Sequence, residues 1–387
     1  MMRIAIVGGA LQGMEAVLLA KAAGYETLVV DRKAAAPAMS LCDEPVVLDP
    51  TKEEDRAIEL FRTCDVVIPA CEEMDLLRTL DRIKGKTGAP LLFDLESYNI
   101  SSSKKKSNEI MGKAGVPMPQ PWPECGFPAI VKPSSQSGSV GVSVAYNEED
   151  IEKGIGIVRG LNDQPIIQEF VHGKSVSIEI IGNGKRSKAY VPTEVCLDSN
   201  YDCKMVKCNP QVMSKSDADA FVRMGEDIGD AIGLNALMDL EAILTPKGLR
   251  VLEIDARIPS QTPAAIEAAT GVNLLEELVT TRLGRPANRS PMSGCSIYRH
   301  VYLRDGILHS SGEKEFGHVV KPHFEKGLFG ADNSISDYEP GKKEWHATLI
   351  STGKTEAQAD ERAAQCIQRI LDECSIEKFI DGVPEMI

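Results

Sequence analysis

The chain has 387 residues, of which 43% are hydrophobic and 26% charged, and its formal net charge is −14. This composition is typical of a soluble globular protein of roughly two to three domains. The negative charge argues against a nucleic acid or an anionic membrane as partner, because both would repel it. The sequence lacks an apolar run near the roughly 20 residues of a membrane span, and it enters a strand at once rather than a signal peptide. Ten dispersed cysteines without a CxxC pair indicate reduced thiols and a cytoplasmic location.

Residues 1–97 predict a nucleotide-type α/β domain. A strand over 2–7 leads into a glycine turn and a helix that stops at Gly24, and further strands are predicted at 27–31, 45–49, 65–70 and 90–94. Strands that alternate with helices indicate a parallel sheet with ligands at the C-terminal strand ends. Those ends carry Gly9–Gln12, Asp31, Asp49 and Glu72–Glu73. The dinucleotide fingerprint is imperfect because Ala10 replaces its middle glycine, so a small-ligand site and ordinary loop capping both fit this edge.

The middle of the chain carries residue types that bind phosphate. Serines at 101–103 are suited to cap a helix that contains Lys104, and a strand that ends at Lys132 runs into a serine- and glycine-rich loop at 134–141. Small residues let backbone N–H groups approach an anion, and a neighbouring lysine neutralises its charge. The loop includes Ser139 and Val140 and is not a Walker loop, since GxxxxGK[ST] does not occur in the sequence. A solvated lysine face and a flexible hairpin tip are the alternatives.

Residues 165–182 predict two strands on either side of His172 and Gly173. The segment Gln168–Val171 offers backbone groups and apolar contact to a nucleotide base. Glu179 falls on the second of these strands.

Residues 238–263 predict an acidic β-hairpin with a turn at 246–248. A three-residue loop would pair Glu241 with Glu253 and Asp239 with Asp255, which places the four carboxylates on one face. The opposite face would carry Leu240, Ala242, Leu252 and Ile254. Like charges on one patch call for a compensating cation, and oxygen ligands favour magnesium, which in enzymes bridges to nucleotide phosphates. A solvated outer face of an amphipathic hairpin is the alternative.

The C-terminal region predicts strands at 295–303 and 344–353, the second followed by an amphipathic helix over 355–374. The six histidines form no HExxH or comparable zinc pattern in the sequence. Because His300, His318, His323 and His346 are scattered, we expect structural roles for them.

Taken in order, these segments resemble the ATP-grasp ligase family. The shared pattern is a helix ending in Gly115–Pro119, the strand and loop over Val131–Gly141, the Gln168–Val171 segment and the acidic run from Glu241 to Arg257. The resemblance implies the ATP-grasp fold, of mixed α/β and α+β class, with a Rossmann-like pre-domain at 1–97, a small lid at 98–170 and a larger catalytic domain at 171–387. It also implies that a carboxylate takes the γ-phosphoryl group of ATP and that an amine attacks the resulting acyl phosphate.

The family resemblance also implies roles for individual residues. The implied ATP contacts are Lys104, Lys132, Ser139, Val140, Glu169, Phe170, Val171 and Asp31, and the implied magnesium ligands are Glu241, Glu253 and Asp255. Arg257 would stabilise the acyl phosphate, with Lys132 as the second catalytic residue. The chain departs from the family pattern at Asp255, where many members carry asparagine, and at Ser103, where an acid is commoner.

Within this family, the segments VGGALQGMEA, LLFDLESYNISSSKKKS and TEVCLDSNYDCKMV resemble the ligases of pyrrolysine biosynthesis, which join 3-methyl-D-ornithine to the ε-amine of L-lysine. The resemblance implies these two amino acids as substrates. Leu11, Gln12 and Glu72 are the expected contacts of lysine. Glu179, Asp202 and Asp239 are the expected partners of substrate ammonium groups, and Arg257 and Ser260 are expected to hold the activated carboxylate.

Three alternatives stay open from the sequence. A D-alanine-type or lysine-modifying ligase would keep the mechanism and change the substrates. An NAD-dependent oxidoreductase is compatible with the glycine turn and Asp31 but leaves Lys132 and the acidic hairpin unexplained. A nucleotide sensor without catalysis has no need of Lys132, Arg257 and all the hairpin carboxylates together.

Overall fold

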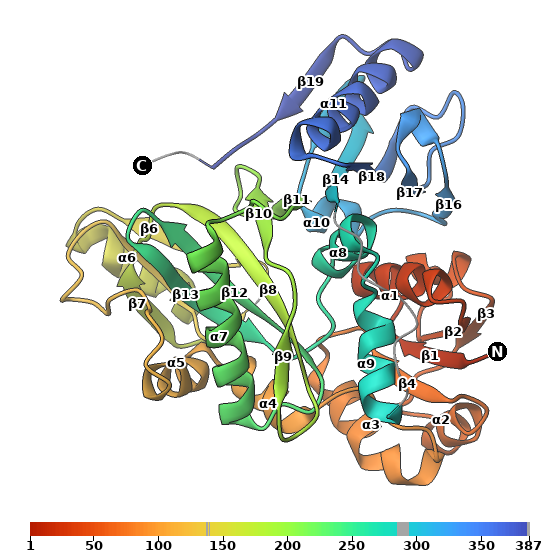
Figure 1. Ribbon diagram of the computed structural model, residues 1–387, viewed down its shortest axis with the longest axis horizontal. Coiled ribbons are helices and arrows are strands. Elements are labelled where there is room, and N and C mark those ends of the chain that lie inside the picture. The colour runs from red at the N-terminus through yellow and green to blue at the C-terminus, as the bar shows by residue number, and fades with distance from the viewer. Residues whose placement is uncertain (137, 139, 285–293, 385–387) are drawn as a thin grey trace. The chain divides into compact units, whose positions relative to one another are not determined.

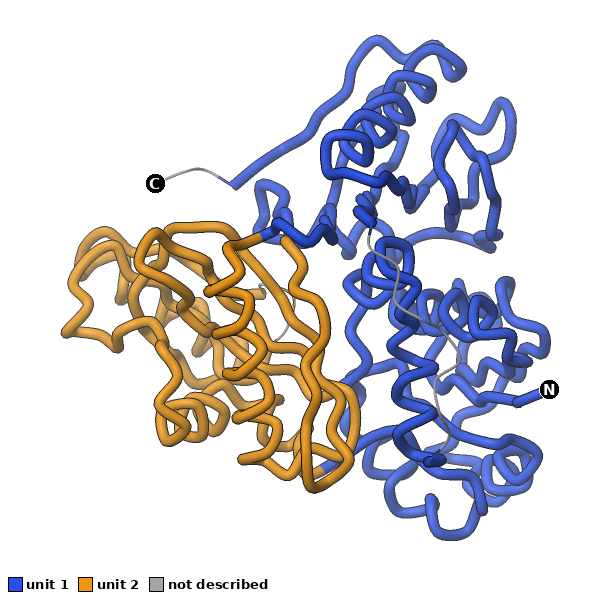
Figure 2. Tube along the Cα trace, viewed as in Figure 1, with its two compact units in different colours: residues 1–95, 195–212, 257–387 blue, residues 96–194, 213–256 orange. Residues whose placement is uncertain are grey.

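The computed structural model describes residues 1–136, 138, 140–284 and 294–384. The chain divides into two compact units (Figure 2). Unit one comprises residues 1–95, 195–212 and 257–387, and unit two comprises residues 96–194 and 213–256. The first boundary between the two units, after residue 95, lies close to the predicted end of the pre-domain at residue 97. The separation of a lid at 98–170 from a domain at 171–387 is not tested by this division and stays a prediction.

The first sheet of unit one is the predicted parallel sheet. Its strands are β1 (Arg3–Val7), β2 (Glu26–Asp31), β3 (Glu44–Val47) and β4 (Val66–Pro69), in the order β3-β2-β1-β4. All three pairings are parallel. Helix α1 (Leu11–Ala22) connects β1 to β2, α2 (Glu54–Phe61) connects β3 to β4, and α3 (Met74–Thr87) follows β4 (Figure 1). The prediction is thus confirmed for these strands.

The predicted strand at 90–94 is wrong. Only one bridge, between Leu91 and Val67, joins this run to the sheet. Helix α4 (Leu95–Ser101) begins directly afterwards, so the extended run is too short to form a ladder.

The glycine turn before α1 shows why two of its glycines are needed. Gly8 has a φ of +114°, which a side chain rarely adopts. A Cβ on Gly13 would lie 2.2 Å from the carbonyl oxygen of Gly8. Ala10 has an ordinary φ of −79° at the helix N-cap, so alanine is tolerated in place of the middle glycine.

The second sheet of unit one is built from the C-terminal region. Its main strands are β11 (Cys203–Cys208), β14 (Cys295–Arg304), β18 (Trp345–Gly353), β17 (Asn333–Ser336) and β16 (His323–Glu325). Strand β15 (Ile307–Ser310) pairs with β14, and β19 (Lys378–Asp381) pairs in parallel with β15. The predictions for β14, β18 and the following helix α11 (Glu356–Glu373) are confirmed.

Helices pack on this second sheet and enclose its core. Helix α11 contacts β18, and α8 (Thr262–Thr270) contacts β11 and β14, while α9 (Leu274–Leu283) contacts α1 (Figure 1). Short helical turns lie at η1 (Pro37–Ser40), α10 (Glu313–Phe316) and η2 (Leu328–Gly330). Trp345 is fully buried in the core between α11 and the sheet. Among the described residues, none of the helices is long and apolar enough to span a membrane.

Unit two contains two antiparallel sheets. The smaller has the order β6-β5-β7 and consists of β5 (Ala129–Pro133), β6 (Ser143–Ala145) and β7 (Pro165–Glu169), with α6 (Glu148–Gly160) packed against it. The larger pairs β13 (Gly248–Asp255) with β12 (Leu237–Thr245), and β12 with β8 (Lys174–Gly182). Strands β9 (Ser187–Ala189) and β10 (Thr193–Leu197) also pair with β8. Helix α7 (Lys215–Ile232) packs on β8 and β9, and α5 (Lys104–Lys113) contacts α7 and β13 (Figure 1).

The acidic hairpin has the predicted pairs of acidic residues, but its loop length differs from the prediction and a β-bulge compensates for the difference. Thr245 pairs with Gly248, so the loop has two residues rather than three. A register shift then follows Glu241, because Ala242 pairs with Val251 whereas Glu241 pairs with Glu253. Leu252 is the extra residue of this β-bulge, and it restores the expected register. Without it, Glu253 would pair with Leu240 and turn its carboxylate toward the core.

The bulge also corrects one core prediction. Leu252 was expected to be buried with Ile254, but it is half-buried, and Val251 takes the buried place with 0% exposure. The reason is that a bulge reverses the alternation of side chains along the strand.

Candidate active site

The larger sheet of unit two gathers carboxylates on one face. Across three neighbouring strands, Glu179 pairs with Asp239 and Asp239 with Asp255. In the adjacent row, Glu241 pairs with Glu253. Paired residues point to the same side of a sheet, so the three predicted metal ligands and two of the predicted substrate acids share this face.

Lysine side chains supply the compensating charge. Lys104 Nζ lies 2.7 Å from Glu253 Oε2 and donates to the carbonyl of Gln136 at 3.0 Å. Burial lowers the pKa of Lys104, but the carboxylates of Glu253, Asp255 and Glu241 outweigh burial, so the net pKa is raised. The ammonium group of Lys104 is therefore firmly charged.

Lys132 lies in the same electrostatic environment but is more deeply buried. It is 7% exposed, and burial lowers its pKa, opposed by the carboxylates of Glu253 and Glu241. Because these carboxylates compensate only part of the cost of burying the charge of Lys132, the site favours the binding of a further anion such as a phosphate group.

Hydrogen bonds from the helix start hold Lys104 in place. Ser103 caps α5, its Oγ accepting from the backbone of Lys106 at 3.5 Å, as its position predicted. The backbone of Lys104 donates to the carbonyl of Ser134 at 2.9 Å, which ties the helix to the loop after β5. Ser101 Oγ accepts from the backbone N–H of Ala256 at 3.0 Å. This hydrogen bond links the segment before α5 to the end of the acidic hairpin.

The carboxylate face fits magnesium that is shared with phosphate. Within the described part of the chain, no group of three or more His, Cys, Asp or Glu side chains is arranged to hold a metal by itself. Magnesium commonly binds through one or two carboxylates together with substrate phosphates and water. Oxygen donors are the only kind that Glu241, Glu253 and Asp255 present, so the donor chemistry agrees with that mode.

The expected base-binding segment lies at the end of β7. The backbone N–H of Glu169 donates to the carbonyl of Gln120 at 2.8 Å, and the Oε2 of Glu169 accepts from the backbone N–H of Gln120 at 3.2 Å. Phe170 stacks edge-on against His172 at 4.9 Å, next to Val171. In the phosphate loop, Val140 is 41% exposed, and Ser139 lies outside the described residues. The predicted ATP contacts of this segment stay predictions.

Unit one contains a separate cavity of about 820 Å³ at the C-terminal ends of its parallel strands. It is lined by the loops after β1, β2, β3 and β4 and by segments 257–260 and 313–320. Five predicted substrate residues, separated by up to 249 positions in sequence, line it together: Leu11, Gln12, Glu72, Arg257 and Ser260. Asp31 also lines this cavity, and its carboxylate accepts from the backbones of Gly9 and Lys33, both at 2.7 Å.

Charged groups in this cavity are joined in pairs. Arg257 Nε lies 2.9 Å from Glu72 Oε1, and Gln12 Nε2 donates to the same oxygen at 3.2 Å. Ser260 Oγ donates to Glu313 Oε2 at 2.8 Å. The cavity therefore offers both a cation for a substrate carboxylate or phosphate and carboxylates for an ammonium group.

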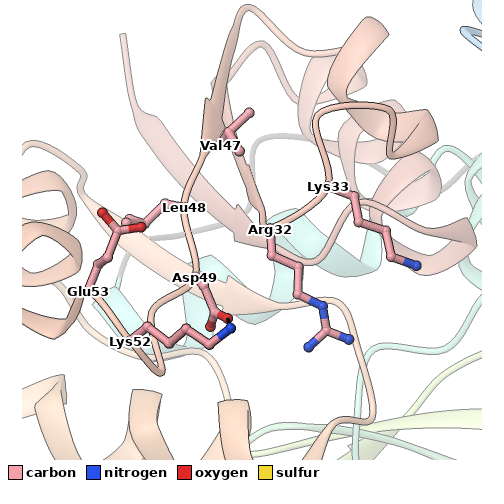
Figure 3. Close-up of a pocket in the computed structure, with 7 residues that line it drawn as sticks. All are labelled: Arg32, Lys33, Val47, Leu48, Asp49, Lys52 and Glu53. Carbon is pink, nitrogen blue, oxygen red and sulfur yellow. Dashed lines mark ion pairs between the residues drawn. The ribbon is translucent and has the colours of Figure 1, made fainter.

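A smaller recess of about 370 Å³ lies at the same end of the sheet (Figure 3). In this view Lys52 points its ammonium group toward Asp49, whereas Lys33 points its charged end away from it. Lys52 Nζ is 3.3 Å from Asp49 Oδ2. The predicted ligand edge of the sheet is thus polar and hollowed at two adjoining places.

Two acidic residues of this region differ from the sequence analysis. Glu313, on α10, was not predicted, because no motif surrounds it and only the fold brings it beside Ser260. Asp202 was predicted to contact substrate, and it is not among the residues that line the cavity. Its carboxylate accepts from the backbone of Lys314 at 3.0 Å, which holds α10 in position. Its substrate contact stays a prediction.

A buried network fixes the segment that carries Arg257 and Ser260. Gln261 has a φ of +70°, which is unfavourable for a residue with a side chain. Its backbone N–H donates to Glu15 Oε2, and Tyr298 O–H donates to Glu15 Oε1. Its side-chain amide contacts His300 Nε2 at 2.8 Å. These bonds hold a strained backbone directly beside Ser260.

Burial sets the protonation of this network. It raises the pKa of Glu15 to about 8 against the opposing hydrogen bonds from Tyr298 and Gln261. It lowers the pKa of His300 to about 3. At neutral pH both side chains are therefore mostly uncharged, and His300 has the structural role expected from the sequence.

Comparison with known proteins places the chain in a family. The sequence pattern of the ATP-grasp domain matches residues 101–261. The chain is 37% identical over 320 residues to a Methanosarcina barkeri protein named 3-methyl-D-ornithine–L-lysine ligase, covering 81% of this chain and 84% of that protein. It is 35% identical over 369 residues to the Methanosarcina mazei protein of the same name, covering 93% of each.

A solved structure supports the fold. The biotin carboxylase domain of Hydrogenobacter thermophilus 2-oxoglutarate carboxylase, crystallised with MgADP, ADP and bicarbonate, superposes with a TM-score of 0.72 at 15% identity. The match covers 95% of this chain and 89% of that chain. Neither comparison favours an oxidoreductase. The chain belongs to the ATP-grasp family, within the group of 3-methyl-D-ornithine–L-lysine ligases.

Proposed function

We propose that this protein is an ATP-dependent ligase that joins the carboxylate of 3-methyl-D-ornithine to the ε-amine of L-lysine, in pyrrolysine biosynthesis. The observation that carries the proposal is the acidic hairpin, whose bulge turns Glu253 and Asp255 to the face of Glu241. The names of relatives at 35% and 37% identity support the choice of substrates. ATP would phosphorylate the donor carboxylate, and lysine would displace phosphate.

The phosphoryl-transfer half of the reaction is assigned to unit two. Lys132 and Lys104 would bind the phosphates of ATP, and Glu241, Glu253 and Asp255 would hold magnesium, as the MgADP complex of the structural relative supports. Magnesium would neutralise charge on the β- and γ-phosphates. Arrival of the nucleotide would replace the ion pair between Lys104 and Glu253 by phosphate and metal contacts.

The hairpin leads directly to the residue that would meet the acyl phosphate. Asp255 and Arg257 are separated by one residue, so the trans chain keeps their Cα atoms within about 7 Å of each other. A guanidinium group is suited to a phosphate because its donors match the phosphate oxygens in a plane. We assign Arg257 to the acyl phosphate and Ser260 to the same group.

The acceptor half is assigned to the cavity of unit one. Glu72 would bind the α-ammonium group of lysine, with Gln12 and Leu11 beside it. Glu179 and Asp239, on the carboxylate face of unit two, are assigned to the ammonium groups of the donor.

The test is a coupled-product assay. The protein is incubated with MgATP, L-lysine and D-ornithine as donor surrogate, and the products are analysed by mass spectrometry. We expect an amide of the two amino acids and one ADP for each amide formed. Amide formation that does not need ATP would refute the proposed mechanism, and ADP release without an amide would refute these substrates.

A further inference from the structure

Glu313 is a carboxylate in the cavity of unit one that the proposed function does not yet use. It lines the cavity together with Arg257 and Ser260 and is half-buried. Its Oε2 accepts from Ser260 Oγ at 2.8 Å. Glu313 thus sits beside the segment assigned to the acyl phosphate.

Hydrogen bonds from the neighbouring backbone fix the position of Glu313. Gly312, directly before it, donates from its backbone to Asp198 Oδ2 at 3.0 Å, and Lys314, directly after it, donates to Asp202 Oδ2 at 3.0 Å. A Cβ on Gly312 would lie 2.2 Å from Asp202 Cγ. The backbone on both sides of Glu313 is therefore held by buried carboxylates.

The chemistry of the acceptor requires a proton acceptor at such a place. A lysine side chain with an ordinary pKa of about 10.4 is protonated at neutral pH, and an ammonium group has no lone pair with which to attack. The amine must lose a proton close to the acyl phosphate. Arg257, Asp202 and Glu72 interact electrostatically with Glu313, and Glu313 interacts in the same way with the buried Glu15.

We propose that the carboxylate of Glu313 accepts the proton from the attacking ε-ammonium group of the acceptor, an inference that rests on the proposed function. The proton passes from the ammonium nitrogen to Glu313, and the freed lone pair attacks the acyl carbon. The C–N bond forms, the bond between carbon and the phosphate oxygen breaks, and phosphate leaves with that electron pair. After the attack, the nitrogen gives a second proton to the departing phosphate, and its third proton remains on the amide.

The geometry favours Glu313 over Glu72 for this role. Glu72 Oε1 already accepts from Arg257 and Gln12, and two donors on one carboxylate stabilise its charged form and make it a weak base. Glu313 accepts from the neutral hydroxyl of Ser260. Burial raises the pKa of Glu313, although Ser260 and Arg257 oppose it, while Asp202 and Glu72 reinforce it. A more basic carboxylate is the better proton acceptor near neutral pH.

The experiment compares Glu313→Gln with the wild-type protein and with Glu315→Gln, using lysine and hydroxylamine as alternative nucleophiles. Glutamine keeps the shape and can still accept from Ser260, but it cannot take a proton. Hydroxylamine is largely uncharged at neutral pH and needs no proton acceptor. Glu315 lies on the same short helix and pairs with Arg304 at 3.1 Å, so its replacement is a matched control.

We expect Glu313→Gln to lower kcat for amide formation about 100-fold or more and to form hydroxamate from the donor at the wild-type rate. Raising the pH should partly restore its amide formation, because more lysine is then uncharged. An equal loss of amide and hydroxamate, a change in KM for lysine alone, or no change would each overturn the role of Glu313. A wild-type protein that forms neither product would overturn the proposed function itself.

Discussion

Replacement of Glu15 by glutamine is expected to flatten the pH dependence of stability in unit one. Glu15 is 1% exposed, and burial raises its pKa from the ordinary value of 4.5 to about 8. Between these two values the folded chain keeps a proton that the unfolded chain has released. The free energy of unfolding therefore falls as pH rises through this interval, and it stops falling above the pKa of Glu15 in the folded state.

The magnitude follows from the two pKa values. One pKa unit corresponds to about 1.36 kcal/mol, so the passage from 4.5 to about 8 corresponds to at most about 5 kcal/mol. Glutamine fills the same volume. Its carbonyl can accept from the backbone of Gln261, and its amide can donate to the hydroxyl of Tyr298, which is free to rotate. The variant should therefore fold, and it has no proton to release.

The assay is urea unfolding between pH 5 and pH 8 in the Trp122→Phe background. The chain has two tryptophans, and the one that remains, Trp345, is buried in unit one, so its fluorescence reports that unit. We expect the unfolding free energy of the parent to fall by a few kcal/mol more than that of Glu15→Gln over this range. The exposed Glu59 supplies a matched control, Glu59→Gln, which should behave as the parent. Parallel curves for parent and Glu15→Gln would refute the reasoning.

Three further predictions concern the two halves of the reaction. Glu253→Ala should abolish magnesium-dependent ATP turnover and leave the circular dichroism spectrum unchanged; normal phosphate release would remove the metal assignment. Glu72→Gln should raise the KM for lysine more than the KM for ATP, whereas an equal effect on both would argue against the acceptor site. Lys132→Met replaces a buried cation by an apolar side chain of similar length, so the melting temperature should hold or rise while the KM for ATP rises about tenfold or more; unchanged ATP affinity would exclude the phosphate contact.

The hairpin shows how far local pattern carries a prediction. Alternation along the strands predicted that Glu241 faces Glu253 and that Asp239 faces Asp255, and both pairs are confirmed. The loop length behind that prediction was wrong, and a bulge at Leu252 compensates for it. Turn chemistry at Pro246 and Gly248 allows more than one loop length, and only pairing with a partner strand selects the register.

The cavity of unit one shows where local pattern ends. Its individual strand ends were predictable from the alternation of strands and helices, but Glu313 carries no motif. Glu15 reads as one polar residue in a helix, yet it meets Tyr298, 283 positions later in the chain. Its pKa is raised by burial, which outweighs the opposing hydrogen bond from Tyr298.

The sequence by itself therefore determined the family, the parallel strands β1 to β4, strands β14 and β18 with helix α11, and the row of hairpin carboxylates, because these depend on local periodicity and on ordered motifs. The tertiary structure alone decided which distant residues share a cavity. It also decided which carboxylates lose contact with water, as Glu15 does. Burial, and contacts between residues hundreds of positions apart, depend on tertiary packing, which the spacing of neighbouring residues does not determine.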